Sequence, residues 1–255
     1  MSTNVQVKYQ NNKPRLKNFL AHNPFSHPLT LGLFYREKMR AIHRVAPDLH
    51  FAKILEIGGG RGGLTALIYP NSHITNIDFD ADFAKAPCNQ KKSVTFVCGD
   101  ATSLPFEDNE FDAVTLFDVL EHIPDHKKAV SEALRVLKSE GFLLVSTPNE
   151  NWEFPYYKVL RPICPKEVEV MNEWGHVRRG YAAQEIEELI GMPCQKFATF
   201  INPVTVICHD LAFSKLSVFQ RILVCLLISP ISWLGYYCHS PQTKGTETAY
   251  VWQNH

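Results

Sequence analysis

Residues Lys53–Leu67, KILEIGGGRGGLTAL, constrain the fold of this 255-residue chain more than any other segment. Lys53–Ile57 is a short run of apolar and β-favouring residues that ends at glycine, which predicts a buried strand. Five glycines lie between positions 58 and 63, and Leu64–Ile68 then begins a helix. A strand, a tight glycine turn and a helix N-terminus form a corner where backbone N–H groups face a bound anion or polar ligand.

Two classes of cofactor fit this corner. Gly58, Gly60 and Gly63 match the G-x-G-x-x-G fingerprint of dinucleotide binding, in which a pyrophosphate lies on the helix N-terminus. The pattern Glu56-x-Gly58-x-Gly60-x-Gly62 also resembles motif I of the class I S-adenosylmethionine (SAM) methyltransferases. A glycine-rich turn without a ligand is the third interpretation, and the glycines alone do not decide among the three.

Composition narrows the function classes. Twenty-six basic and 26 acidic residues give no net charge, so we expect no nucleic-acid partner. Hydrophobic residues make up 45% of the chain, which predicts a full globular core. The seven cysteines contain no CxxC pair, which indicates reduced thiols in a cytoplasmic protein. The N-terminal residues lack the apolar segment of a secretory signal.

Acidic residues recur at the ends of predicted strands. Further strands are predicted at 73–77, 94–98, 112–117 and 142–146. The acids at the ends of the first four strands are Glu56, Asp78, Asp100 and Asp118. Because parallel strands end at one edge of a sheet, these acids should line one ligand crevice. Asp78 lies 22 positions after Glu56, where a ribose-binding acid is expected, although a helix cap is the alternative.

Two later phrases favour the SAM interpretation. VTFVCGDATSLPFEDNEFDAV resembles the methyltransferase stretch in which a strand-end acid, here Asp100, meets the adenine amino group. FDVLEHIPD, residues 117–125, resembles the region after the fourth strand in the type-11 branch, which includes the quinone-biosynthesis enzymes. The resemblance covers about residues 53–201. It implies a Rossmann-like α/β fold: a mostly parallel seven-stranded sheet with helices on both faces and an inserted or C-terminal helical lid.

Three segments are expected along the chain. Residues 1–50 are an N-terminal arm and a cap helix, Leu31–Val45, that starts near Thr30. Residues 51–201 are the SAM-binding core, with an acceptor-side insertion at 149–181. Residues 202–255 form an apolar helical lid and a final antiparallel strand. The apolar stretch 211–238 is interrupted at Ser229-Pro230, which predicts two short helices rather than a membrane span and leaves loose membrane contact open.

The resemblance also implies the site residues. The expected cofactor-binding residues are Glu56, Gly58, Gly59, Gly60, Asp78, Phe79, Asp100, Ala101 and Phe117. His122 and His176 are candidate general bases, with a structural role equally weighted for each. Arg178, Arg179 and Tyr181 are candidate acceptor-binding residues. No set of histidines and acids has a metal-like spacing, so no metal is predicted.

The sequence therefore predicts a SAM-dependent methyltransferase. Its acceptor would be small or amphipathic: a specialised metabolite, quinone precursor, sugar or lipid. Oxygen or nitrogen is the expected methylated atom, with carbon less expected. The alternatives are an NAD(P)-dependent oxidoreductase and a SAM-binding protein without catalysis. We expect a cytoplasmic protein, peripheral to a membrane at most, and the sequence leaves its oligomeric state open.

Overall fold

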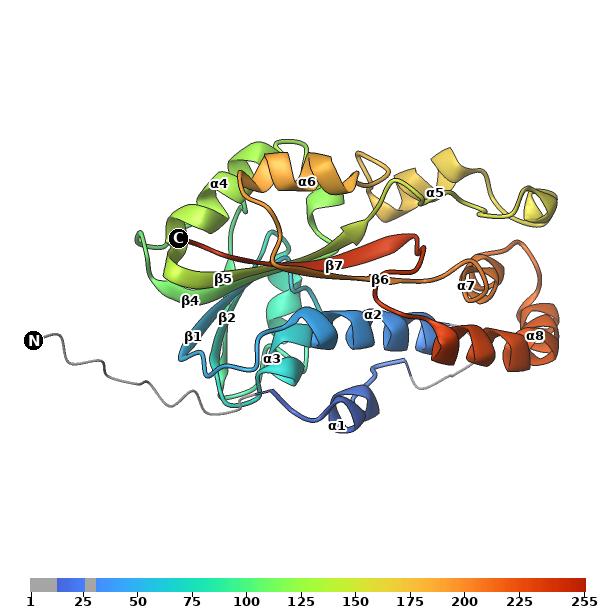
Figure 1. Ribbon diagram of the computed structural model, residues 1–255, viewed down its shortest axis with the longest axis horizontal. Coiled ribbons are helices and arrows are strands. Elements are labelled where there is room, and N and C mark those ends of the chain that lie inside the picture. The colour runs from blue at the N-terminus through green and yellow to red at the C-terminus, as the bar shows by residue number, and fades with distance from the viewer. Residues whose placement is uncertain (1–12, 26–30) are drawn as a thin grey trace, which may run out of the picture.

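The computed structural model describes residues 13–25 and 31–255, and its centre is a seven-stranded sheet (Figure 1). The strand order is β3-β2-β1-β4-β5-β7-β6. The strands are β1 Lys53–Ile57, β2 His73–Asp78, β3 Val94–Cys98, β4 Phe111–Phe117, β5 Leu137–Pro148, β6 Lys196–Phe200 and β7 Glu247–Gln253. This arrangement confirms the predicted fold class.

Strand direction fixes where a ligand can bind. Strands β1 to β5 pair in parallel, and β7 runs antiparallel to both β5 and β6. The order of connection reverses at β1 and β4, since the chain passes from β1 outward to β2 and β3 and then returns to β4. Ligands of such sheets bind beyond the carboxyl ends of the strands at this switch point. The prediction that the last strand is antiparallel is confirmed.

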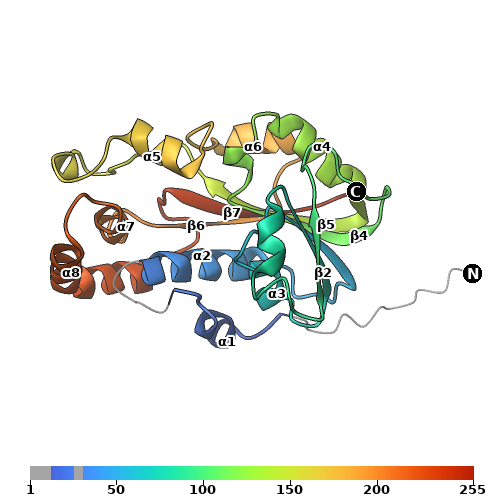
Figure 2. The same cartoon turned by 180° about the vertical axis from the view of Figure 1, so that it is seen from behind.

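Helices cover both faces of the sheet (Figures 1 and 2). On one side lie α2 and α3, and on the other lie α4 and α6. The helices are α1 Leu16–Ala21, α2 Leu31–Val45, α3 Leu64–Ile68, α4 His126–Val136, α5 Glu167–Trp174, α6 Ala183–Ile190, α7 Val206–Ala212 and α8 Val218–Cys238, with short 3₁₀ turns η1 Ala81–Lys85, η2 Leu120–His122 and η3 Lys158–Leu160.

Alternating side chains of the strands supply two separate cores. Ile54 of β1 packs with Met39 and Ile42 of α2 in one core, whereas Leu55 packs with Ala133 of α4 in the other. Period-2 alternation sends neighbouring strand residues to opposite faces, so both faces of β1 are buried. Burial of both faces explains why the strand appears in the sequence as a continuous apolar run.

One prediction for the N-terminal residues needs correction. Residues 16–21 form the helix α1, with Phe19 buried, where a weakly patterned arm was expected. Residues 1–12 and the expected helix start at Thr30 lie outside the described residues. The helix α2 otherwise has the predicted bounds, Leu31–Val45.

The prediction of two short helices in 211–238 is wrong. The structure has one continuous helix, α8, with Pro230 inside it. Proline lacks the N–H that would bond to the carbonyl four residues earlier, which belongs to Leu226. The Ser229 hydroxyl donates to that Leu226 oxygen at 2.9 Å, so the carbonyl keeps a partner. This local compensation lets the helix continue through the proline.

We expect the Glu132 carboxylate to stabilise the loop after β3 in a pH-dependent way. Glu132 accepts hydrogen bonds from Arg135 and from the backbone N–H of Leu104, and the Arg135 hydrogen bonds lower the pKa of Glu132 from 4.5 to about 2. Because the folded pKa lies below the unfolded one, this stability is complete above about pH 5 and is lost as the pH falls toward 2.

Urea unfolding checks this expectation. Glu132→Gln should lower the free energy of unfolding at pH 7 by about 1.5–3 kcal/mol, and the deficit should narrow between pH 5 and pH 3. The exposed Glu107→Gln is a matched control with the same charge change and should have little effect. A deficit that stays constant with pH would contradict the proposed role of the carboxylate.

Candidate functional site

The glycine turn after β1 adopts left-handed backbone angles that favour glycine, and close packing excludes a larger residue at two positions. Gly58 has φ +67° and Gly63 has φ +55°. A Cβ atom at Gly58 would lie 2.5 Å from Val119 Cγ2, and one at Gly63 would lie 2.5 Å from Cys88 Cβ. Both the dihedral angles and the close packing therefore require glycine at these two positions. The turn lies at the carboxyl end of β1.

Two acids fasten this turn to the sheet. Glu56 accepts a hydrogen bond from the backbone N–H of Thr65, at the start of α3, over 3.1 Å. Asp78, at the end of β2, accepts from the N–H of Gly60 at 3.1 Å. Burial raises the pKa of Asp78, although these backbone hydrogen bonds oppose the shift. The cap of η1 is Asp80, whose carboxylate accepts from Asp82 N, so Asp78 is not used as a helix cap.

A cavity of about 810 Å³, the edge cavity, lies beyond the carboxyl ends of the strands. A small cavity of about 70 Å³, the corner cavity, lies between the glycine turn and α2. Of the nine predicted cofactor-binding residues, six line the edge cavity: Gly58, Gly60, Asp78, Phe79, Asp100 and Ala101. The others, Glu56, Gly59 and Phe117, line the corner cavity with Tyr35 and Lys38 of α2. The structure thus gathers all nine around two adjoining spaces.

A third space of about 180 Å³, the inner cavity, adjoins the edge cavity. Asp118, His122 and Trp174 line both spaces and therefore form their boundary. Four aromatic side chains contribute to the inner cavity: Phe34, Trp152, Trp174 and Phe213. The inner cavity is suited to an apolar or aromatic group held next to a ligand of the edge cavity.

Asp118 is the polar centre of this boundary. Its backbone has φ +54°, its side chain forms an ion pair with Lys38, and the Ser146 hydroxyl donates to it at 2.5 Å. Burial disfavours the charge of Lys38, yet the neighbouring Asp118 outweighs burial and raises the pKa of Lys38. A positive φ in a non-glycine residue is strained, and such strain is typical of functional sites.

Two further acids of the inner cavity are buried, and the pKa of each carboxyl group is raised. Burial, together with the charge of Asp118, raises the pKa of Glu121 to about 8 and raises that of Glu247 well above its usual value. Thr147 donates to Glu121 at 3.2 Å, whereas Oε2 of Glu247 has no hydrogen-bond partner among the described residues. Glu247 therefore offers an unused polar atom close to this cavity.

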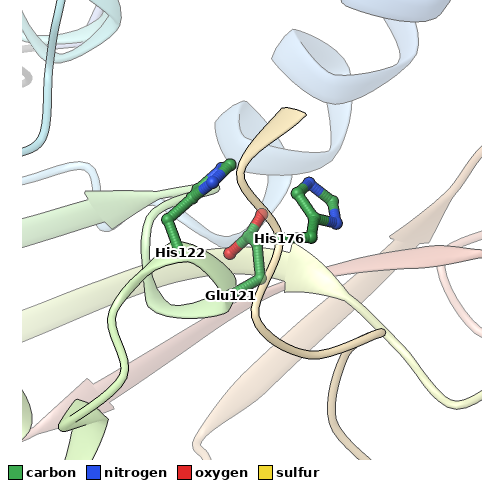
Figure 3. A group of neighbouring side chains, drawn as sticks. All are labelled: Glu121, His122 and His176. Atoms are coloured by element: carbon green, nitrogen blue, oxygen red, sulfur yellow. The ribbon is translucent and has the colours of Figure 1, made fainter. Parts of the chain in front are cut away.

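The two candidate bases lie together at this boundary (Figure 3). The rings of His122 and His176 are 4.8 Å apart between centroids, and the Glu121 carboxylate lies beside them, with the ligand atoms of the three residues within 4.8 Å of one another. Burial, with a contribution from His122, lowers the pKa of His176 to about 4, so His176 is neutral at pH 7. Within the described part of the chain, its Nδ1 atom has no hydrogen-bond partner.

These three residues are also the one group in the described ranges that could hold a metal ion. Their ligand atoms lie within 4.8 Å of one another. Ligands bound to one zinc ion at about 2.0–2.1 Å would be separated by roughly 3.4 Å in a tetrahedral site, so the group would have to contract to bind one. The expectation that no metal is used stays a prediction.

None of the predicted acceptor-binding residues lines the edge, corner or inner cavity. Arg178 donates to the backbone carbonyls of Leu120, Ile123 and Pro124, so its guanidinium ties down the η2 turn. Tyr181 is 1% exposed and donates to the Leu120 carbonyl at 3.1 Å. The remaining residue, Arg179, is largely exposed and forms an ion pair with Glu167. Their positions argue against an acceptor-binding role for all three.

Several residues of the inner cavity come from segments that are far apart in the sequence and were not predicted. These are Phe34, Trp152, His209, Phe213 and Glu247. No regular sequence spacing connects these residues, because α2, α7 and the paired ends of β5 and β7 meet only in the folded structure. The one available signal was the aromatic content of the insertion at 149–181, which contains Trp152 and Trp174.

Comparisons with known proteins agree with this geometry. Residues 55–145 match the family model described as a methyltransferase domain. A demethylmenaquinone methyltransferase of Renibacterium salmoninarum is 35% identical over 96 residues, which cover 37% of this chain and 40% of that protein. The ubiquinone/menaquinone biosynthesis C-methyltransferase UbiE of Pseudomonas aeruginosa is 36% identical over 112 residues, covering 39% and 44%. This chain therefore spans less than half the length of these two curated relatives.

Solved structures show the same fold over a longer range. The N-methyltransferase NodS of Bradyrhizobium japonicum, in complex with S-adenosyl-L-homocysteine, aligns with a TM-score of 0.56 over 96% of this chain and 99% of that chain. At 15% identity this similarity shows the fold alone. The family match contains the glycine turn, Asp78, Asp100 and Asp118, whereas His176 and much of the inner cavity lie outside it.

We expect His176 to titrate far below an ordinary histidine. Its pKa in the isolated protein should be about 4, because burial and the neighbouring His122 disfavour the charged ring. Nitrogen-15 NMR of the imidazole between pH 3 and pH 8 measures this value. His122→Ala should raise it, whereas a wild-type value near 6.5 would show that His176 is solvated.

Proposed function

We propose that this protein is a SAM-dependent methyltransferase that transfers the methyl group of SAM to an oxygen or nitrogen of a small, amphipathic acceptor. The match of residues 55–145 to a methyltransferase domain, the partial similarity to quinone-biosynthesis methyltransferases and the shared fold support this proposal. The observation that supports this most strongly is the shared boundary of the edge and inner cavities. Asp118, His122 and Trp174 separate a large space lined by the cofactor motif from a smaller aromatic space beside it.

The edge and corner cavities fit the parts of SAM. Asp78 can accept hydrogen bonds from ribose hydroxyls, and Asp100 with Ala101 lies where the family places adenine. The corner cavity, with Glu56, Tyr35 and Lys38, suits the polar amino-acid end of the cofactor. The bound cofactor supplies an already activated methyl group, so the protein has to position the acceptor and exclude water.

The inner cavity is the proposed acceptor site. Its aromatic walls suit an apolar ring or chain, and its few polar groups can orient one hydroxyl or amine. His176 is neutral at pH 7, and its Nδ1 atom has no hydrogen-bond partner among the described residues, so it can accept a hydrogen bond from the hydroxyl or amine that is methylated. It is the proposed base, and a bound acceptor has to raise its pKa from about 4 for efficient proton transfer. The second histidine, His122, lies nearer the cofactor side because it lines both cavities.

Methylation at carbon is the second candidate. The two curated relatives named above are quinone-biosynthesis methyltransferases, one of them named a C-methyltransferase, and an aromatic inner cavity would also accept a quinol ring. NMR of the product formed from SAM with a carbon-13 methyl group shows whether the methyl is bonded to oxygen, nitrogen or carbon. Direct bonding of the labelled methyl to a ring carbon would replace the oxygen or nitrogen proposal.

Calorimetry with S-adenosylhomocysteine and with NADH tests the cofactor. We expect micromolar binding of the first and none of the second. Asp78→Ala should weaken S-adenosylhomocysteine binding by about 1.5–3 kcal/mol, roughly 10- to 150-fold, because the ribose hydroxyls lose a charged acceptor. The nearby Asp82→Ala, on the exposed side of η1, should bind normally. Tight NADH binding without S-adenosylhomocysteine binding would support the oxidoreductase alternative.

Single-turnover assays test the proposed base, once screening of phenols, quinols and amines for SAM consumption has identified an acceptor. His176→Ala should retain cofactor affinity and lower the methyl-transfer rate about 10²-fold or more. His73→Ala, an exposed residue at the start of β2, is the matched control. If neither His176→Ala nor His122→Ala slows transfer, the reaction depends on positioning alone.

A further inference from the structure

Helix α8 presents an apolar stripe that no other described element covers. Phe219, Leu223, Leu227, Ile231 and Leu234 recur at intervals of three or four residues, so they lie along one face of the helix. Their side chains are between 49% and 76% exposed. Exposed apolar surface of this extent on a soluble domain marks an interaction site.

The opposite face fastens α8 to the domain. Cys225, Ser232 and Tyr236 are buried. Arg40 of α2 donates to the Tyr236 carbonyl at 2.7 Å, and Asn202 donates to the Gly235 carbonyl at 2.9 Å. Among the described helices, α8 is the one long and apolar enough to cross a membrane by length and composition. Because these contacts hold it along α2 and α7, it can lie in a membrane surface but cannot cross the bilayer without breaking them.

The basic residues around the stripe favour an anionic lipid surface as the partner. No acidic residue occurs between Leu211 and Thr246, and the charged residues of this stretch are Lys215, Arg221 and Lys244. Lys215 also forms an ion pair with the exposed Glu169 at 4.0 Å, and Arg221 donates to the Ala212 carbonyl at 2.6 Å. The η3 segment adds two exposed basic residues, Lys158 and Arg161, around Val159, which is 81% exposed. Lys215 N donates to the Ile163 carbonyl at 2.7 Å, which joins this segment to the chain that enters α8. Figures 1 and 2 show η3 and α8 at the same end of the molecule.

Basic and apolar side chains combined in this way match the interface of an anionic bilayer. The apolar stripe can enter the boundary between head groups and acyl chains, while the lysines and arginines meet lipid phosphates. The chain as a whole has no net charge, so the attraction is local to this end. A second copy of the chain would bring the same basic residues together without an acidic complement within α8, so an anionic surface is the better match.

The membrane-facing end also lies next to the inner cavity. Leu33 of α2 and Cys208 of α7 pack against Tyr236 of α8. The neighbouring residues Phe34 and His209 of the same two helices line the inner cavity. Only the thickness of α2 and α7 therefore separates the apolar stripe from the proposed acceptor site.

We propose that α8 docks this protein on an anionic membrane surface and that the acceptor is a membrane-resident amphiphile, with an apolar chain and a polar head that enters the inner cavity. The docking itself stands on the exposed stripe and the basic residues. The acceptor class rests on the function proposed above and fails with it, whereas the docking does not.

Vesicle flotation of the full-length protein tests the docking. Vesicles of phosphatidylcholine with phosphatidylglycerol should carry the protein at low salt, and vesicles of phosphatidylcholine alone should carry less. The triple variant Phe219→Ser, Leu223→Ser, Leu227→Ser should reduce the bound fraction tenfold or more, with unchanged circular dichroism and S-adenosylhomocysteine binding. Val168→Ser with Phe197→Ser, two exposed apolar residues outside α8, is the matched control and should bind like the wild type.

Four results would overturn the docking. These are no flotation of the wild type with anionic vesicles, equal flotation of the triple variant, a concentration-dependent dimer that the triple variant abolishes, and resistance of the membrane-bound protein to carbonate extraction. The last result would indicate a true span. Because flotation needs neither SAM nor acceptor, and calorimetry needs no lipid, the two proposals fail separately.

Discussion

The partly buried ion pair between Lys38 and Asp118 links α2 to the strand ends of the candidate site. Removing charges from water is costly, and the Ser146 hydroxyl, which also donates to Asp118, helps to offset that cost. The pair fastens α2 to the end of β4. The same helix then places Tyr35 and Lys38 in the corner cavity and Phe34 in the inner cavity. Helix α2 therefore contributes residues to two of the three cavities, although it lies outside the residues that match the family model.

The remaining acids of the site depend on this pair. The charge of Asp118 adds to burial in raising the pKa of Glu121 and of Glu247. The charge of Lys38 opposes this shift in both acids. A protonated carboxyl group can donate a hydrogen bond to a bound ligand, whereas the neutral ring of His176 can accept one. The inner cavity thus combines two acids of raised pKa and a histidine of lowered pKa in a space lined by aromatic rings.

Local patterns predicted which residues gather at the strand ends and could not predict the residues of the inner cavity. The glycine turn and the strand-end acids are set by neighbours in sequence, so all nine residues expected to bind the cofactor line the edge or corner cavity, and their binding role stays a prediction. Arg178 was expected to bind an acceptor because a guanidinium can hold an anionic group. Its three backbone carbonyl partners lie more than 50 positions away, so the local sequence could not reveal them. The break expected at Pro230 failed for another reason: the Ser229 hydroxyl replaces the missing donor, a detail that proline statistics do not include. Glu247 escaped notice because only the sheet brings β7 beside Asp118.

The proposed function requires that the edge cavity hold SAM with its methyl group directed at the inner cavity. A crystal structure with S-adenosylhomocysteine measures this directly. We expect the ribose on Asp78, the amino-acid end in the corner cavity beside Lys38, and the sulfur atom at the boundary formed by Asp118, His122 and Trp174. A ligand in the edge cavity whose sulfur faces away from that boundary, or a ribose without contact to Asp78, would contradict it.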